Sequence, residues 1–364
     1  MFKYNVYKPS LTGNEKKYVN ECLDTTWISS KGKFVSEFEE KFSKYIGVNY
    51  GTAVCNGTVA IHLALVALGI GEGDEVIVPT FTYIASVNPI VQVGATPVFA
   101  DSDKDDWQIS PDDIERKITP KTKAIIVVHL YGHPCKMDKI MEIAKKHNLL
   151  IIEDCAEAIG SEFDGKKVGS FGDVACFSFF GNKTMTCGEG GMCLTNDPTI
   201  YDRLSRLKGQ GLAKFREYWH DMIAFNYRMT NIAAAIGCAQ LEQVQIFIDK
   251  KQNVASWYKK YLEGVPVKIH EAKGKAFHTY WMNSILVEKG QNREKLRDFL
   301  HKEGIETRPT FYPVHTMPMY SVKFTSHKVA EDIALRGINL PSYPDLEEED
   351  IKYICEKIEN FFNK

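Results

Sequence analysis

The chain has 364 residues, a formal net charge of -2 and a hydrophobic fraction of 44%, which are ordinary values for a globular protein with more than one core. The near-neutral charge gives no reason to expect a nucleic acid or an anionic membrane surface as a partner. No apolar stretch approaches the roughly 20 residues of a membrane-spanning helix, and the N-terminus lacks the apolar run of a secretory signal. The nine cysteines show no zinc-binding spacing, so we expect a cytoplasmic protein with reduced thiols and no metal site.

Two amphipathic helices are expected first, over residues 14–23 and 35–46, and a regular alternation of strands and helices begins at residue 50. Strands are predicted over residues 51–55, 76–79, 96–100, 124–129, 149–153 and 174–180. Helices are predicted between several of them, over residues 59–68, 112–117 and 137–146. Because strands that alternate with helices form parallel sheets covered on both faces, this part of the chain predicts an α/β fold.

The pattern changes in the C-terminal third of the chain. A long helix is predicted over residues 230–262, followed by strands over 279–287 and 307–312 and helices over 293–302, 328–336 and 348–362. This order is typical of a small α+β domain. We therefore expect a large α/β domain over residues 1–245, which includes the N-terminal segment, and a small C-terminal domain over residues 246–364.

The stretch over residues 177–192 is the most informative part of the sequence. An apolar, strand-like run delivers Lys183 into a loop of small and polar residues that is rich in glycine. A flexible amine between stiff flanks, with glycines that let backbone approach closely, suits carbonyl chemistry at the amine. A surface lysine in a turn is the simplest alternative. A phosphate-binding loop is excluded, because Asn182 separates Gly181 from the lysine and no helix follows directly.

Residues at other predicted strand ends supply partners for this lysine. Gly57 and Thr58 stand at the start of a helix, where free N–H groups bind anions, although Thr58 also suits a plain helix cap. Asp154 ends a buried strand, which is where ligands bind in open α/β sheets. No further carboxylates support a metal. A lysine and an aspartate fit pyridoxal phosphate, in which the lysine forms a Schiff base and the aspartate keeps the ring nitrogen protonated.

Two further side chains extend this hypothesis. Ser178 precedes Lys183 on the same run, and its hydroxyl could bind the phosphate group. It could equally be a core serine whose hydroxyl is hydrogen-bonded within the fold. Tyr83 follows another predicted strand, where an aromatic face stacks on a planar ring. Ordinary aromatic packing is the alternative for Tyr83.

These residues resemble the DegT/DnrJ/EryC1/StrS sugar aminotransferases over nearly the whole chain. The resemblance rests on motifs that occur in the same order, namely Asn56-Gly-Thr58, Val78-Pro79, Glu153-Asp154, the stretch 177–191 and Phe225-Asn226-Tyr-Arg228-Met229. It implies the aspartate-aminotransferase fold, known as fold type I, with pyridoxal phosphate as the cofactor. It also implies a homodimer whose active sites are shared between the subunits.

The resemblance assigns a role to each matching position. It makes Lys183 the Schiff-base lysine and Asp154 the partner of the pyridine nitrogen, and it places Gly57, Thr58 and Ser178 on the phosphate, Tyr83 on the ring face and Asn226 in the active site of the neighbouring subunit. Many family members have glutamine at the position of Glu157, near the ring hydroxyl. An ionised glutamate would repel that oxygen, so we expect Glu157 to be protonated or to point elsewhere.

A second set of motifs is similar to one branch of the family, which aminates GDP-4-keto-6-deoxy-D-mannose at C4 with L-glutamate in a ping-pong reaction. They are Leu11-Thr-Gly13, the stretches 27–32, 209–212, 218–221 and 278–282, and Phe311-Tyr-Pro-Val-His315 with its continuation to Tyr320. The resemblance implies that the product enters a surface polysaccharide such as the O-antigen of lipopolysaccharide.

Four residues are candidates for contacts with the substrates: Ser29, Arg228, Arg308 and His315. Either arginine suits the carboxylate of the amino donor, and either equally suits a structural ion pair. His315 and Ser29 are candidates for contacts with the sugar or the nucleotide. The alternative for His315 is a hydrogen bond to the backbone of its own loop.

Three alternatives remain open from the sequence. An aminotransferase for a dTDP- or UDP-linked keto sugar shares every cofactor residue. A related branch dehydrates the same GDP-keto sugar at C3, but histidine replaces the Schiff-base lysine there, and this chain has Lys183. A pyridoxal-phosphate-binding regulator without turnover is disfavoured by the intact pair of Lys183 and Asp154.

Overall fold

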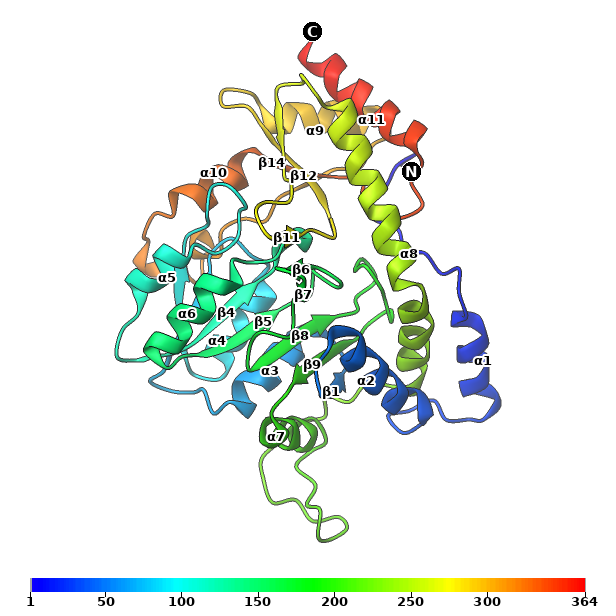
Figure 1. The fold of residues 1–364 in the computed structure, drawn as a ribbon, viewed down its shortest axis with the longest axis vertical. Helices are drawn as coiled ribbons and strands as arrows, with labels where there is room; N and C mark the ends of the chain where they lie inside the picture. The colour runs from blue at the N-terminus through cyan, green and yellow to red at the C-terminus, as the bar shows by residue number, and fades with distance from the viewer. Residues whose placement is uncertain (1, 364) are drawn as a thin grey trace.

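The computed structural model describes residues 2–363, and a seven-stranded sheet forms its centre (Figure 1). The strand order is β1-β9-β8-β5-β4-β2-β3. The strands are β1 (Tyr50–Val54), β2 (Glu75–Pro79), β3 (Thr96–Ala100), β4 (Thr122–Val128), β5 (Leu150–Asp154), β8 (Val174–Ser178) and β9 (Gly191–Thr195). β9 is antiparallel to both of its neighbours, and the other strands run in one direction. The predicted mainly parallel sheet is confirmed.

Both faces of this sheet are covered, as the sequence of β4 illustrates. Ile126 and Val128 pack into one core with α3 (Gly57–Ala67), α4 (Asn88–Gln92) and α7 (Pro198–Lys208). Ile125 and Val127 pack into another core with α5 (Pro111–Lys117) and α6 (Met137–His147). Because side chains alternate between the faces of a strand, a continuous β-branched run is buried on both sides.

The C-terminal part builds a smaller four-stranded sheet in the order β10-β12-β14-β13. Its strands are β10 (Val267–Ile269), β12 (Asn283–Val287), β13 (Arg308–Pro309) and β14 (Gly337–Leu340), and its helices are α9 (Arg293–Lys302), α10 (Lys328–Arg336) and α11 (Glu348–Phe362). A third sheet joins β11 (Ala276–Phe277), β6 (Glu162–Phe163) and β7 (Lys166–Lys167). Short 3-10 turns are η1 (Ile84–Ser86), η2 (Leu130–Gly132), η3 (Val314–Thr316) and η4 (Ser321–Lys323).

A long helix, α8 (Asn231–Tyr261), runs from the flank of the large sheet to the small one (Figure 1). It packs against α1 (Glu15–Asp24), α2 (Lys33–Ile46) and α11. The predicted helix over 230–262 is therefore confirmed, whereas the predicted division at 245/246 falls inside α8 and remains a prediction. No helix within residues 2–363 combines the length and the apolar character that crossing a bilayer requires.

Several elements differ from the sequence-based expectation. β9, α7 and β14 were not predicted, although Asp197 accepts hydrogen bonds from the N–H groups that open α7, which is an ordinary capping signal. The strand expected over 279–287 begins only at Asn283, because Tyr280 has a positive φ of 50° and interrupts the extended backbone. The strand expected over 307–312 is reduced to two residues, since Pro309 has no N–H group to donate to a ladder.

The small sheet and α8 are connected through a fully buried lysine, Lys251. Its ammonium group donates to the backbone carbonyls of Tyr280, Trp281 and Ser342 at 3.4, 3.2 and 2.6 Å. Burial lowers the pKa of Lys251 to about 7, while the three carbonyl acceptors favour the charged form. The ammonium thus ties the backbone around Trp281 to α8.

We predict that Lys251→Met lowers the free energy of unfolding by about 2–4 kcal/mol, because it leaves buried carbonyls without donors. The neighbouring Lys250→Met is the matched control, since Lys250 is 44% exposed and pairs with Asp345 at 3.0 Å. Its loss should stay below about 1 kcal/mol. Urea unfolding measures both values, and equal losses would contradict this role of Lys251.

Candidate active site

Lys183 lies in the loop that follows β8, and its side chain is mostly buried, with 13% of its surface exposed. The backbone N–H of Lys183 donates to the carbonyl of Phe180 at 3.0 Å, and the Tyr7 hydroxyl donates to the Lys183 carbonyl. The amine nitrogen lies 3.9 Å from Glu157 Oε1 and 4.1 Å from the ring centroid of Trp281. Burial lowers the pKa of Lys183, and the nearby carboxylates oppose that shift. A buried amine with a lowered pKa is suited to act as a nucleophile and a base.

Asp154 ends β5 and is also buried. Its carboxylate accepts a hydrogen bond from the Ser86 hydroxyl at 2.7 Å and another from the N–H of Ala156 at 3.0 Å. Burial raises the pKa of Asp154, and these two donors favour the ionised form. A cation placed against this carboxylate, such as a protonated ring nitrogen, would offset the remaining cost of burying its charge.

Glu157 points toward Lys183 rather than away from it. One of its oxygens accepts a hydrogen bond from the N–H of Tyr131 at 2.9 Å, and the other faces the Lys183 amine. Burial raises the pKa of Glu157 to about 7, and the charge of Lys183 acts in the opposite direction. Near neutral pH this carboxyl group therefore holds its proton for part of the time, which is the protonated alternative considered from the sequence.

The start of α3 and the end of β8 meet at a tight backbone contact. A Cβ atom on Gly57 would lie 2.7 Å from Ser178 Cβ, so the close approach requires glycine. Asn56 caps the helix by accepting from the N–H of Val59 at 3.0 Å. The first N–H groups of a helix, here those of Gly57 and Thr58, have no acceptor within the helix. These groups lie beside Ser178, and free N–H groups at a helix start can bind an anion such as a phosphate.

Two other predicted residues lie at the end of β2 and in the loop that packs on it. Tyr83 is 58% exposed, and its ring centroid lies 5.7 Å from that of Phe311. His315 is buried, with Nδ1 2.6 Å from the Thr80 hydroxyl and Nε2 3.2 Å from Glu331. Both ring nitrogens of His315 are therefore engaged within the fold, and its contact with a substrate stays a prediction.

The remaining candidates lie on surface segments. Ser29 is exposed, and its carbonyl accepts from the N–H of Asn231, which fixes this loop to α8. Asn226 is exposed, forms a bridge with Gly209 directly after α7, and accepts a hydrogen bond from Arg228 at 2.9 Å. Arg228 also lines a hollow of about 330 Å³. Arg308 lies on β13 and pairs with a neighbouring glutamate at 3.3 Å. Within the described chain these four residues are not brought to the Lys183 amine.

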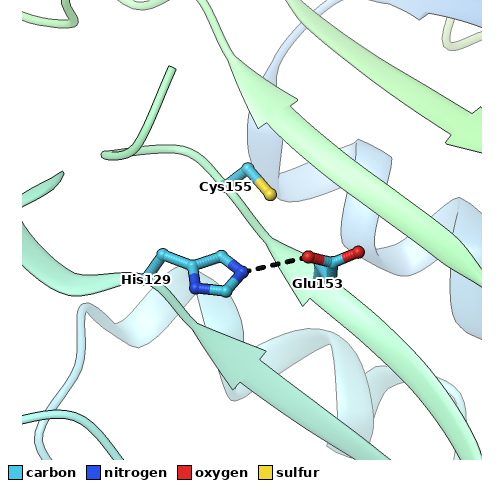
Figure 2. A group of neighbouring side chains, drawn as sticks. All are labelled: His129, Glu153 and Cys155. Carbon is cyan, nitrogen blue, oxygen red and sulfur yellow. Dashed lines mark hydrogen bonds and ion pairs between the residues drawn. The ribbon is translucent and has the colours of Figure 1, made fainter. Parts of the chain in front are cut away.

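A buried cluster of His129, Glu153 and Cys155 lies beside the site, and Figure 2 shows how the three side chains face one another. His129 accepts from the N–H of Cys135 through Nδ1, so Nε2 carries the proton and donates to Glu153 at 3.1 Å. Both nitrogens are occupied, which leaves no lone pair for a metal. Glu153 also accepts from the N–H groups of Gly169, Phe171 and Gly172. The cluster therefore anchors a loop to β5.

The same cluster yields a pH-dependent prediction. Burial by itself raises the pKa of Glu153, but the hydrogen bonds from His129 and the loop lower it below its usual range. Its stabilising contribution is therefore fully present above the unfolded pKa of about 4.3 and is lost as the pH falls through the folded pKa. We predict that Glu153→Gln lowers the free energy of unfolding by about 2–4 kcal/mol at neutral pH, and by progressively less below about pH 4.

Urea unfolding of the wild type and the variant at several pH values measures this difference. Glu162→Gln is the control, because the Glu162 side chain is 30% exposed and pairs only with Lys167 in the described chain. A difference that does not change with pH would show that Glu153 contributes through packing alone.

The comparisons with known proteins identify the family of the chain. The model of the DegT/DnrJ/EryC1/StrS aminotransferase family matches residues 9–359. The chain belongs to this family. It is 62% identical to the GDP-perosamine synthase of Escherichia coli O157:H7, over 98% of each chain. It is 51% identical to that of Vibrio cholerae, over 98% of this chain and 99% of the relative.

A solved structure agrees with this assignment. The putative sugar aminotransferase Spr1654 from Streptococcus pneumoniae, in its PLP form, superposes with a TM-score of 0.93 at 29% identity, over 98% of both chains. The predicted fold type I and the predicted class of enzyme, a sugar aminotransferase, are therefore confirmed.

The residues of this site fit pyridoxal phosphate. The ends of β1, β5 and β8 lie at one edge of the sheet, and they lead to a helix start with free N–H groups, the buried carboxylate of Asp154 and the amine of Lys183 respectively. A small aromatic ring that carries a phosphate and a basic nitrogen matches these three features. No single strand supplies them all, which is why the order of the sheet matters.

Several residues that surround the lysine had no role predicted from the sequence. Trp281 and Tyr7 contact Lys183, and Ser86 and Tyr131 donate to the two carboxylates. Trp281 lies within the stretch 278–282, which was noted only as a motif of the family branch. Tyr7 had no signal, since its contact with Lys183 joins residues far apart in the sequence.

Proposed function

We propose that this enzyme transfers the amino group of L-glutamate to C4 of GDP-4-keto-6-deoxy-D-mannose and so forms GDP-perosamine. The observation that carries this proposal is the identity of 62% and 51% to two relatives named GDP-perosamine synthase, over nearly the full length of each chain. These similarities do not favour the alternative of a dTDP- or UDP-linked keto sugar.

Pyridoxal phosphate is the cofactor of this reaction, and when bound it supplies an electron sink for negative charge at the carbon that gains or loses the amino group. Lys183 would hold it through the amine nitrogen. When the lysine is released, the same nitrogen would take a proton from the α-carbon of the donor. The lowered pKa of Lys183 supports this role, because a base needs a free lone pair near neutral pH.

The other residues would bind and orient. Asp154 would hold the ring nitrogen in its protonated form, with Ser86 and the N–H of Ala156 fixing the carboxylate. Gly57, Thr58 and Ser178 would bind the phosphate, and Tyr83 would cover the ring face. Glu157 would keep its proton beside the ring hydroxyl. Its raised pKa supports this protonated form.

The substrate contacts are proposed from the family resemblance. We infer that Ser29 and His315 contact the sugar or the nucleotide, and that Arg228 or Arg308 binds the donor carboxylate. Asn226 would complete the active site of a second subunit in a homodimer. The exposed position of Asn226 supports that arrangement. The cytoplasmic location and the use of the product in a surface polysaccharide stay predictions.

A panel of keto sugars tests the substrate. The purified enzyme is incubated with the cofactor, L-glutamate and one keto sugar linked to GDP, dTDP or UDP, and amino sugar and 2-oxoglutarate are measured by mass spectrometry. We expect both products with GDP-4-keto-6-deoxymannose. Turnover with only a dTDP- or UDP-linked sugar would overturn the substrate, and turnover with none would overturn the reaction.

A substitution tests the amine. We predict that Lys183→Ala reduces transamination by at least about a thousandfold, because no other group in the site can replace the nucleophile. Lys289→Ala, at an exposed position, serves as the control and should retain activity. Circular dichroism and size-exclusion chromatography report whether the variant remains folded. Appreciable remaining turnover would exclude Lys183 as the catalytic lysine.

A further inference from the structure

The indole ring of Trp281 is fixed in place by contacts on several sides. It is buried, and its Nε1–H group donates to the Asn182 carbonyl, directly before Lys183, at 2.6 Å. The Trp281 carbonyl accepts from the Lys251 ammonium at 3.2 Å. The ring also lies nearly parallel to that of Tyr131, with an angle of 11° and centroids 6.1 Å apart. A ring held in this way presents a stationary face.

That face is directed at the reactive amine. The Lys183 nitrogen lies 4.1 Å from the Trp281 ring centroid, well inside the distance of about 6 Å over which an aromatic face attracts a cation. On another side the nitrogen is 3.9 Å from Glu157. The amine nitrogen therefore contacts both the face of Trp281 and the carboxyl group of Glu157.

We propose that Trp281 is a positioning residue for Lys183, whose unlinked ε-ammonium group it holds beside Glu157 during transamination. The proposal rests on the proposed function, in which Lys183 is released and later returns. A four-carbon side chain released into an open site would sample many conformations, and confining it lowers the entropy lost when the amine reacts again. A cation-binding face retains the charged amine without forming a bond that has to be broken.

Few charged or titratable groups face this amine from the surrounding elements. Asp154 ends β5 and Glu157 follows it. Both carboxyl groups favour the charged form of Lys183, whereas burial favours the neutral form. Tyr7 donates to the Lys183 carbonyl rather than to the amine. The face of Trp281 adds to the effect of the two carboxylates. Its removal should therefore move the pKa of Lys183 further down.

The test measures the pKa of Lys183 in the cofactor-free enzyme. Trace acetylation with acetic anhydride from about pH 6 to about pH 11 brackets the ordinary lysine value of about 10.4. Mass spectrometry then quantifies the peptide that contains Lys183 at each pH. We expect Trp281→Leu to lower the pKa by about half a unit, which raises the reactive fraction of the amine about threefold at a fixed pH below the pKa. Trp281→Phe keeps an aromatic face and should stay close to the wild type.

Trp107→Leu is the control for the loss of a buried indole. Trp107 is buried and stacks on His270 at 4.1 Å, away from the lysine. This variant should lower the melting temperature without moving the pKa of Lys183. An unchanged or raised pKa in Trp281→Leu, or a pKa in Trp281→Phe as low as that of the leucine variant, would overturn the proposal. If the leucine variant does not fold, a Lys183 pKa in Trp281→Phe that lies half a unit or more below the wild-type value would overturn the proposal, because phenylalanine keeps an aromatic face.

The outcome is independent of the proposed function. The pKa of Lys183 is measured without cofactor or substrate. If the pKa does not shift, the positioning role of Trp281 fails, and the products formed from the keto sugars still decide the proposed function. Conversely, an enzyme that accepts none of those sugars can still show the shift in Trp281→Leu.

Discussion

The mostly buried amine of Lys183 is the feature on which the other elements of the site depend. Taking an ammonium group out of water is unfavourable, and the structure compensates with two carboxylates and an aromatic face. Each of these groups is itself buried and needs its own partners. Ser86 and Tyr131 supply hydrogen bonds to Asp154 and Glu157. The polar network therefore extends from one nitrogen atom to several elements of the fold.

The sheet determines how these groups meet. Because β1, β5 and β8 run in the same direction, the side chains and N–H groups that follow them gather at one edge. β9 returns between β8 and β1, and Gly191 at its start passes so close to the Asn56 carbonyl that a Cβ atom would lie 2.4 Å from it. The small residues around the lysine thus have a packing role as well as a chemical one. They let the start of α3 approach the end of β8.

Residues from the C-terminal part of the chain hold the loop that contains Lys183. Lys251 holds the backbone around Trp281, and Trp281 in turn touches Lys183 and the carbonyl before it. Tyr7, from the N-terminal segment, contacts the Lys183 carbonyl from another direction. The reactive loop is therefore clamped by segments that lie far from it in the sequence.

Much of the fold was predictable from the sequence, because it depends on local patterns. The alternating strands and helices, the long helix α8 and the helices of the C-terminal part follow from periodicity that a short window contains. Lys183 and Asp154 were predicted as site residues for a similar reason, since each stands at or after the end of an apolar strand. Trp281 and Lys251 were not, because their roles arise from contacts between distant segments. β9 was missed because its glycines are typical of a loop, and only pairing with β1 and β8 makes it a strand.

We expect Lys183 to be the one residue that joins to pyridoxal phosphate. Incubating the enzyme with the cofactor, reducing it with borohydride and mapping the peptides by mass spectrometry tests this claim directly, because reduction makes the attachment permanent. We predict that the added mass of the cofactor is found on the peptide containing Lys183 and is absent in Lys183→Ala. Attachment to another lysine, such as the buried Lys251, would contradict the assignment of the site.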